Sequence, residues 1–216
     1  DSIELVALYI PVEYAEKSTS YISFYVDKTQ GIINSVPKKV SDIGSIVKYS
    51  VPDEWFGVNK NNGAFYIKSE YSNKKTKLKY LAIPSQFNGT TVASIANDGL
   101  KDCTNLVYIS LPYTLRQFGT SALANCKKII SHLTIYPRIT NIGANAFYGS
   151  SIIFDSVDLT GCTSSGSVGI NAFTGTTVKK LIVNNNGVKA ESKGYSVSSS
   201  SDKYPFYNVK GFETQR

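Results

Sequence analysis

The chain has 216 residues, with 23 Lys plus Arg, 16 Asp plus Glu, one His, three Cys and no Met. A content of 42% hydrophobic and 18% charged residues excludes a disordered polyelectrolyte, and no apolar run is long enough to span a membrane. Three Cys cannot form the dense disulfide framework of a small secreted domain, and a single His excludes a His-rich metal site. Because the chain starts at Asp1 without Met, we expect that a leader was removed, which fits a secreted protein.

The charge is distributed unevenly along the chain. Residues 1–70 contain seven Lys plus Arg and nine Asp plus Glu, whereas residues 71–216 contain 16 and seven, which gives net charges of −2 and +9. A basic surface favours anionic partners such as an acidic polysaccharide, although solubility alone also explains it. We do not expect nucleic acid as a partner, because the Lys residues are scattered in pairs and no nucleic-acid-binding signature is present.

The first 62 residues contain three stretches that alternate between apolar and polar side chains. These stretches are Ile3 to Ile10, Ser20 to Val26 and Ser45 to Val51, with turn residues between them. They predict a small β-rich region over residues 1–62, which is either a sandwich-like module or a cap on the part that follows.

A repeat fills the middle of the chain. Four segments share the order apolar, small, two variable, small, Leu or Phe, two variable, and then Cys, Ser or Thr. They are residues 95–103, 118–126, 142–150 and 168–176, offset by 23, 24 and 26 residues. Self-similarity at such a period indicates a solenoid, in which each coil buries its apolar side chains against its neighbours.

A second apolar series lies between these segments and predicts the strands. Its members are Leu78/Leu81/Ile83, Leu106/Ile109/Leu111, Ile130/Leu133/Ile135, Phe154/Val157/Leu159 and Val178/Leu181/Val183. The alternation predicts strands with one buried face, and Pro84 and Pro112 directly follow two of them, where ladder pairing should end.

These motifs resemble the BspA-like, or Treponema-type, leucine-rich repeat family. Residues 106–126 match its repeat closely, from Leu106 through Leu111-Pro112 and Phe118-Gly119 to Cys126. The resemblance implies an α/β leucine-rich-repeat solenoid over residues 63–212. It should have about five coils, a parallel sheet on one side, short helical or 3₁₀ segments on the other, an entry hairpin made by residues 63–67 and 78–83, and a closing segment at residues 204–211. Residues 187–203 should form a surface loop.

The resemblance also implies a function class. It predicts a secreted or cell-surface, non-enzymatic recognition or adhesion module of bacterial type, which binds a protein or an acidic polysaccharide on a host or neighbouring cell. We expect a monomer without cofactor, metal or transmembrane segment. The alternative is a structural spacer that displays other domains of a larger surface protein.

The strand register predicts a candidate recognition strip on the outer sheet face. One outward column holds Tyr80, Tyr108, His132, Ser156 and Lys180. Exposed aromatic rings in such a column are typical of binding hot spots, although ordinary solvated sheet residues explain the column too. His132 with Ser110 and Asp158 also suggests a catalytic triad, but an open sheet face without oxyanion donors argues against this.

The cysteines divide into two kinds. Cys103 and Cys126 hold the same repeat position one coil apart, and we expect both to be buried at a coil corner rather than joined in a disulfide. Cys162 belongs to the stretch Gly161 to Ser167 that interrupts the fourth coil, and we expect it to be the exposed thiol.

Overall fold

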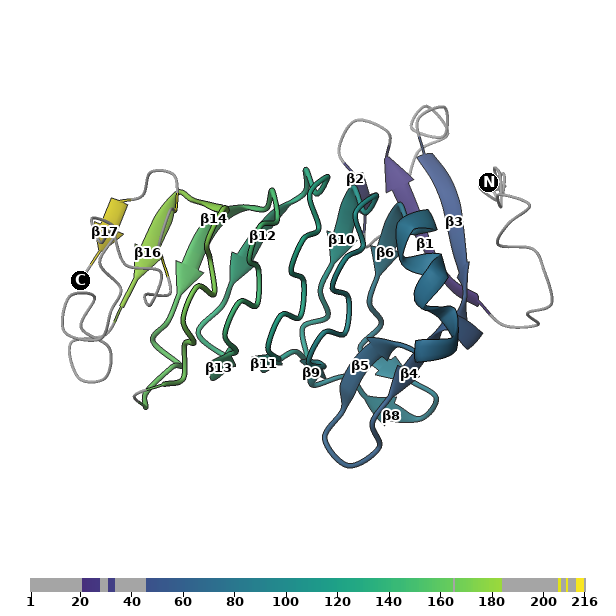
Figure 1. Ribbon diagram of the computed structural model, residues 1–216, viewed down its shortest axis with the longest axis horizontal. Helices are drawn as coiled ribbons and strands as arrows, with labels where there is room; N and C mark the ends of the chain where they lie inside the picture. Colours follow the sequence, from purple (N-terminus) through teal and green to yellow (C-terminus); the bar gives the residue numbers. More distant parts are fainter. Residues whose placement is uncertain are drawn as a thin grey trace, which may run out of the picture.

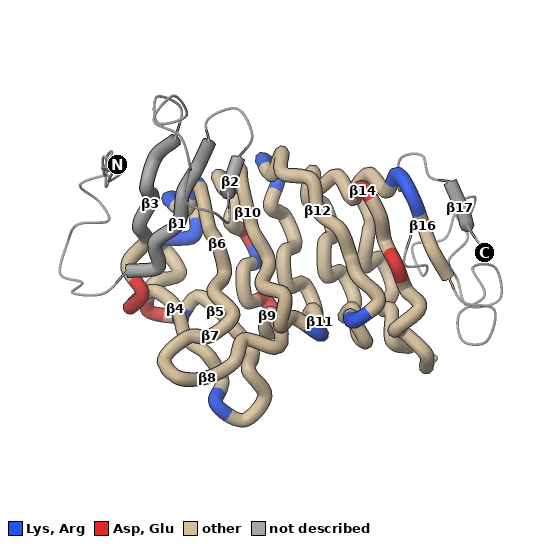
Figure 2. The backbone as a smooth tube through the Cα atoms, turned by 180° about the vertical axis from the view of Figure 1, so that it is seen from behind, with Lys and Arg blue, Asp and Glu red and all other residues tan. Residues whose placement is uncertain are grey.

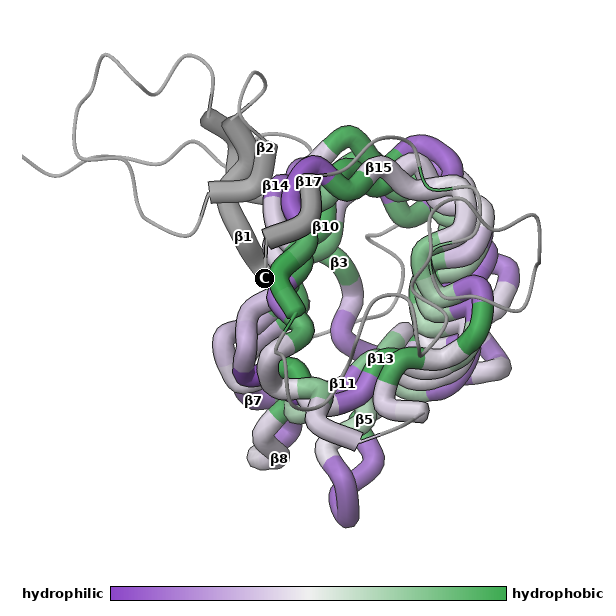
Figure 3. The backbone as a smooth tube through the Cα atoms, turned by 90° about the vertical axis from the view of Figure 1, so that its left-hand side faces the viewer, coloured by the Kyte–Doolittle hydropathy of each residue, from purple (hydrophilic) through white to green (hydrophobic). Residues whose placement is uncertain are grey.

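The computed structural model describes residues 21–27, 31–33, 46–164, 166–183, 206, 209 and 213–215. Within them the chain winds into a solenoid whose coils stack along one axis (Figures 1 and 3). Each coil passes through a longer strand, a short strand and a turn, so the solenoid has a long-strand side, a short-strand side and a turn side. The strand expected at Ile3 to Ile10 and the loop expected at residues 187–203 lie outside the described residues.

The long-strand side contains five strands that bound four turns of the solenoid. They are β6 (Tyr80–Ala82), β10 (Tyr108–Ser110), β12 (His132–Ile135), β14 (Ile153–Asp158) and β16 (Lys180–Ile182). Strand β10 pairs in parallel with β6, and β12 pairs with β14, which pairs with β16. Two further parallel strands are β15 (Thr177–Val178), beside β14, and β17 (Glu213–Gln215), beside β16. The expected parallel leucine-rich-repeat sheet is therefore confirmed.

The short-strand side is a single five-stranded sheet in the order β13-β11-β9-β5-β4. Its strands are β4 (Phe56–Val58), β5 (Ala64–Ile67), β9 (Ser94–Ile95), β11 (Gln117–Phe118) and β13 (Asn141–Ile142). The hairpin expected between residues 63–67 and 78–83 is wrong. Strand β5 pairs with β4 and β9, whereas β6 pairs with β10, because the 3₁₀ segment η3 (Ser69–Lys77) carries the chain from one side to the other.

A small hairpin interrupts the first coil. It joins β7 (Gln86–Phe87) to β8 (Thr90–Thr91) through Asn88 and Gly89, whose φ angles of 48° and 74° are those of a two-residue hairpin turn. Asn and Gly are residues that such a turn favours, because both of its central positions require positive φ.

The turn side contains turns where short helical segments were expected. Each turn has two residues with positive φ, four positions apart, and a residue in that conformation cannot continue a right-handed helix. The pairs are Asp98/Asp102, Ser121/Asn125, Asn145/Gly149 and Asn171/Gly175. Helical structure in the described residues is confined to η3 and to η2 (Asp53–Trp55).

Three rows of buried side chains, one from each side of the coils, meet in the core. The long-strand row is Leu81, Ile109, Leu133, Val157 and Leu181; the short-strand row is Phe65, Ile95, Phe118, Ile142 and Val168; the turn row is Leu100, Leu123, Phe147 and Phe173. Phe206 closes the C-terminal end, because its ring stacks on Phe173 at a centroid distance of 4.7 Å. One expected core position is wrong: Ile130 is 56% exposed, and Ile129 is buried in its place.

Before the solenoid lies a three-stranded antiparallel sheet in the order β2-β1-β3. Its strands are β1 (Tyr21–Asp27), β2 (Gly31–Ile33) and β3 (Ile46–Pro52), so strands occur at both of the expected stretches that the structure describes. Strand β1 lies beside β6, and β2 lies beside both β6 and β10 (Figure 1). The sheet therefore sits against the first coils of the long-strand side.

The three cysteines are all buried as free thiols. Cys103 and Cys126 lie at coil corners, as expected, and the Cys126 thiol lies 3.3 Å from the carbonyl oxygen of Leu100. The expected exposure of Cys162 is wrong, because its thiol turns inward and lies 3.4 Å from the carbonyl oxygen of Ile139, one coil away. Burial raises the pKa of Cys162 to about 11.

The native protein is expected to resist thiol reagents. The thiolate is the reactive species. All three thiols are buried and therefore inaccessible, and the raised pKa values of Cys103 and Cys162 keep these two thiols protonated at pH 8. Ellman's reagent should therefore detect the three thiols only after the protein unfolds. The exposed neighbour Thr163 provides the control, since Thr163→Cys should add one thiol that reacts at once. Rapid reaction of the unsubstituted native protein would contradict the burial of Cys162.

Candidate recognition surface

The outward face of the long-strand side carries the candidate strip. Tyr80 and Tyr108 are paired in register on β6 and β10, and their rings stack at a centroid distance of 5.7 Å with an interplanar angle of 9°. Both side chains are half-buried. The stacking holds the two rings as one flat amphipathic platform of fixed orientation.

The strip is not continuous from Tyr108 to His132. The backbone N–H of Ile109 donates to the hydroxyl oxygen of Ser131 at 3.2 Å rather than to a backbone carbonyl, so a side chain intervenes between β10 and β12 at this point. The register shifts again between β12 and β14, where Leu133 faces Phe154 and Thr134 faces Ser156. Such a one-residue irregularity is a β-bulge, and it places Ser156 opposite Thr134 instead of His132.

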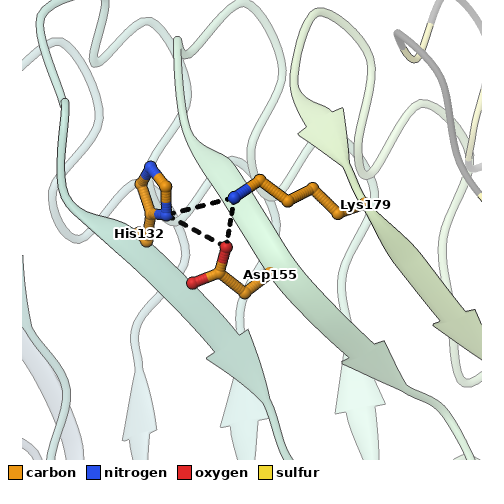
Figure 4. A network of polar contacts seen from close by, with 3 residues as sticks. All are labelled: His132, Asp155 and Lys179. Atoms are coloured by element: carbon orange, nitrogen blue, oxygen red, sulfur yellow. Dashed lines mark hydrogen bonds and ion pairs between the residues drawn. The ribbon is translucent and has the colours of Figure 1, made fainter.

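His132 belongs to an ionic cluster with Asp155 and Lys179 (Figure 4). Its Nδ1 lies 2.9 Å from Oδ1 of Asp155, and Nζ of Lys179 donates to the same carboxylate oxygen at 2.7 Å. The Nζ of Lys179 is also 3.4 Å from His132 Nδ1. The shorter distance favours an Nδ1–H that donates to Asp155, while Nε2 points away from the carboxylate (Figure 4). All three side chains are about half-exposed.

Asp155 and Lys179 were missed because they occupy the column next to the strip. Between two buried strand positions, such as Phe154 and Val157, the repeat places two outward residues, and the candidate strip contains only the second of them. The sequence contains a signal for this second column. Two variable residues between two apolar strand positions place two neighbouring columns of side chains on the outer face. Lys180, the last member of the strip, lies on β16 directly after Lys179.

The catalytic triad interpretation is not supported by the contacts. His132 contacts Asp155, whereas Asp158 accepts hydrogen bonds from the backbone N–H and the hydroxyl of Thr160 at 2.9 and 2.6 Å. None of the described cavities is lined by His132. What the arrangement can do chemically is present an exposed ion pair to a partner, whereas the half-buried tyrosine pair lies on the strands against which β1 and β2 sit.

The Asp155 carboxylate is expected to contribute stability only above its unfolded pKa. Although partial burial raises its pKa, the hydrogen bond from Lys179 and the positive charge of His132 together lower the pKa below its ordinary value. A lowered folded-state pKa stabilises the protein above about pH 4, and this contribution disappears as the pH falls through the folded-state value. Because the groups are half-exposed, we expect about 0.5 kcal/mol at low salt.

Urea unfolding of the unsubstituted protein and Asp155→Asn provides the measurement. The unsubstituted protein should have the higher free energy of unfolding at pH 6, and this difference from Asp155→Asn should vanish near pH 2. Ser151→Ala, at another exposed position between β12 and β14, is the control for pH-independent effects. A difference between Asp155→Asn and the unsubstituted protein that stays constant down to pH 2 would contradict the role of the carboxylate charge.

The stacked coils, the parallel strands and the apolar rows define a leucine-rich-repeat solenoid. The chain belongs to the BspA type leucine rich repeat family, whose model matches residues 66–202 in six copies. Among solved structures it is similar to the crystal structure of a leucine rich repeat protein of T. pallidum, with 16% identity, a TM-score of 0.35, and coverage of 62% of this chain and 85% of that one. No curated protein matches the sequence.

Membership of this family indicates a protein-interaction or repeat scaffold module. Among the described residues no helix is both long and apolar enough to cross a membrane. Figure 2 shows Lys and Arg scattered along the coils, as the paired Lys residues of the sequence suggested.

Proposed function

We propose that this protein is a secreted or cell-surface recognition module that binds a protein partner on the open face of its long-strand side. The observation that carries the proposal is the half-exposed His132–Asp155–Lys179 cluster, which lies on the coils beyond β6 and β10, the strands against which β1 and β2 sit. Charged side chains that hold one another in place present a fixed charge pattern, and a partner surface with the complementary pattern gains specificity from it.

The solenoid supports this proposal in a second way. Its coils present one broad sheet face rather than an enclosed cleft, and such surfaces suit macromolecules better than small substrates. The mixed charge of the cluster favours a protein over an acidic polysaccharide, because Asp155 would repel a polyanion at the place where Lys179 attracts it. We further propose that residues 1–62 cap the solenoid, since β1 and β2 lie against its first long strands, and that the module is a monomer.

The experiment is a binding screen of the full chain against extracellular matrix and host surface proteins. At least one protein should bind, and both Asp155→Ala and Lys179→Ala should weaken that binding by about tenfold or more. Tyr148→Ala, on the turn side and 44% exposed, is the matched control and should bind as before. Binding to heparin alone would instead show an acidic polysaccharide partner. The absence of any binding at low salt would overturn the proposal and favour a structural spacer.

A further inference from the structure

The short-strand side carries a groove that the recognition strip does not use. It has a volume of about 440 Å³ and crosses the strands β5, β9, β11 and β13, a distance of about 14 Å at the usual strand spacing. Amide side chains make up most of the polar part of its lining, from Asn59, Asn62, Asn97, Gln117 and Asn141. No charged residue of the described chain lines the groove, although residues 71–216 carry a net charge of +9.

The floor of the groove is shaped by small residues of the repeat. Ala96, Gly119 and Gly143 follow the buried positions of β9, β11 and β13, and the two glycines bring no side chain into the groove. The glycines are required by the packing of the coils, because a Cβ at Gly119 or Gly143 would lie 2.5 Å from a backbone nitrogen of the preceding coil. The groove is thus a consequence of close coil packing, and its floor is rigid backbone.

The amide groups at one end and along one wall are oriented by the backbone. The Oδ1 atoms of Asn59, Asn62 and Asn97 accept hydrogen bonds from the backbone N–H groups of Asn61, Ala64 and Thr120, at 2.9, 3.1 and 2.8 Å. Their NH₂ groups therefore have fixed positions and no partner among the described residues. On the other wall, Gln117 and Asn141 stand in register on neighbouring strands, and each offers both a donor and an acceptor.

An aromatic ring closes the groove at the β5 end. Tyr66 pairs with Gly57 across β4 and β5, and its ring lies over this glycine so closely that a Cβ at Gly57 would be 2.6 Å from the ring carbon Cζ. Because glycine has no side chain, the Tyr66 ring can lie directly over Gly57, and the ring supplies the groove with a flat apolar surface.

We propose that this groove binds a neutral oligosaccharide segment. Sugar hydroxyl groups both donate and accept hydrogen bonds, which amide side chains complement, and the apolar face of a sugar ring packs on an aromatic ring. An acidic or sulfated glycan does not fit, because no cation in the lining would offset the loss of water from its charges. A peptide fits less well, because the backbone floor lacks the pockets that side chains of a bound strand require.

Affinity gel electrophoresis of the full chain tests the proposal. The probes are the neutral polysaccharides β-glucan, xylan, galactomannan and amylose, with heparin and polygalacturonate as anionic comparisons. At least one neutral polysaccharide should retard the protein, and the retardation should persist at high salt because no ion pairs contribute to it. Retardation by none of the neutral polysaccharides, or retardation that high salt removes, would overturn the proposal.

Variants locate the site. Tyr66→Ala and Gln117→Ala should each weaken binding by about tenfold or more, whereas Tyr148→Ala on the turn side should leave it unchanged. Gln117 is exposed, so Gln117→Ala decides the matter alone if Tyr66→Ala does not fold. Lys179→Ala should also leave glycan binding unchanged, which separates this groove from the protein-binding face proposed above. Equal weakening by Tyr148→Ala and Gln117→Ala would show that the groove is not the site.

Discussion

Phe147→Ala is expected to lower the free energy of unfolding by about 4 kcal/mol. The Phe147 ring is fully buried and contacts Phe118, Phe154 and Phe173, at centroid distances of 4.9, 5.0 and 5.2 Å. Its removal leaves a cavity between three coils, and a solenoid depends on contacts between neighbouring coils for its stability. Urea unfolding followed by circular dichroism measures the loss.

The matched control is Phe147→Leu. Leu100 and Leu123 hold the same repeat position in the two preceding coils and are fully buried, so a leucine is compatible with this place in the coil. We expect a loss of about 1.5 kcal/mol, well below that of the alanine variant. Equal losses for both variants would show that aromatic contacts rather than cavity volume determine the stability of this row.

Gly143→Ala is expected to cost about 3 kcal/mol, although it adds only a methyl group. The new Cβ would lie 2.5 Å from the backbone nitrogen of Thr120 and 2.6 Å from the carbonyl carbon of Gly119. A rotamer change cannot relieve this contact, because both neighbours are backbone atoms. The coils would have to move apart and weaken the hydrogen bond from Gly143 N–H to the Phe118 carbonyl, which measures 2.8 Å.

Ala96→Gly provides the comparison for this variant. Ala96 holds the same repeat position in the first coil, where the preceding strand is β5 and a Cβ is accommodated. Its replacement should cost only about 0.5–1 kcal/mol, from the greater freedom of glycine in the unfolded chain. Thermal unfolding of both variants measures the contrast. If Gly143→Ala proved as mild as Ala96→Gly, the coils would not be packed at backbone contact.

Much of the fold could be predicted because each coil contacts only its neighbours. A period of about 24 residues therefore fixed which side chains face inward, as the rows ending in Leu181 and Phe173 show. The corner positions of Cys103 and Cys126 followed from the same period. Tyr80 and Tyr108 share one column of the repeat, and their rings stack because these two strands pair without a register shift.

The errors occurred where one coil departs from the period. The irregular register between β12 and β14 separates His132 from Ser156. His132 instead contacts Asp155 and Lys179, which stand in the neighbouring outward column. Ile129 replaces Ile130 in the core for a related reason, since the third coil has one residue more between its first two buried strand positions. Pattern matching at constant spacing cannot detect a single inserted residue that changes which side chain points inward.

The sequence by itself determined the repeat, the solenoid and most of its buried rows, because apolar periodicity is a local property that every coil repeats. Only the tertiary structure decided that Cys162 points inward, that positive φ angles keep the turn side from being helical, and that amides from the β4–β5 loop and from β9 to β13 surround a groove. These features depend on the distances between backbones of adjacent coils, and such distances follow from packing rather than from the order of residues within any one coil.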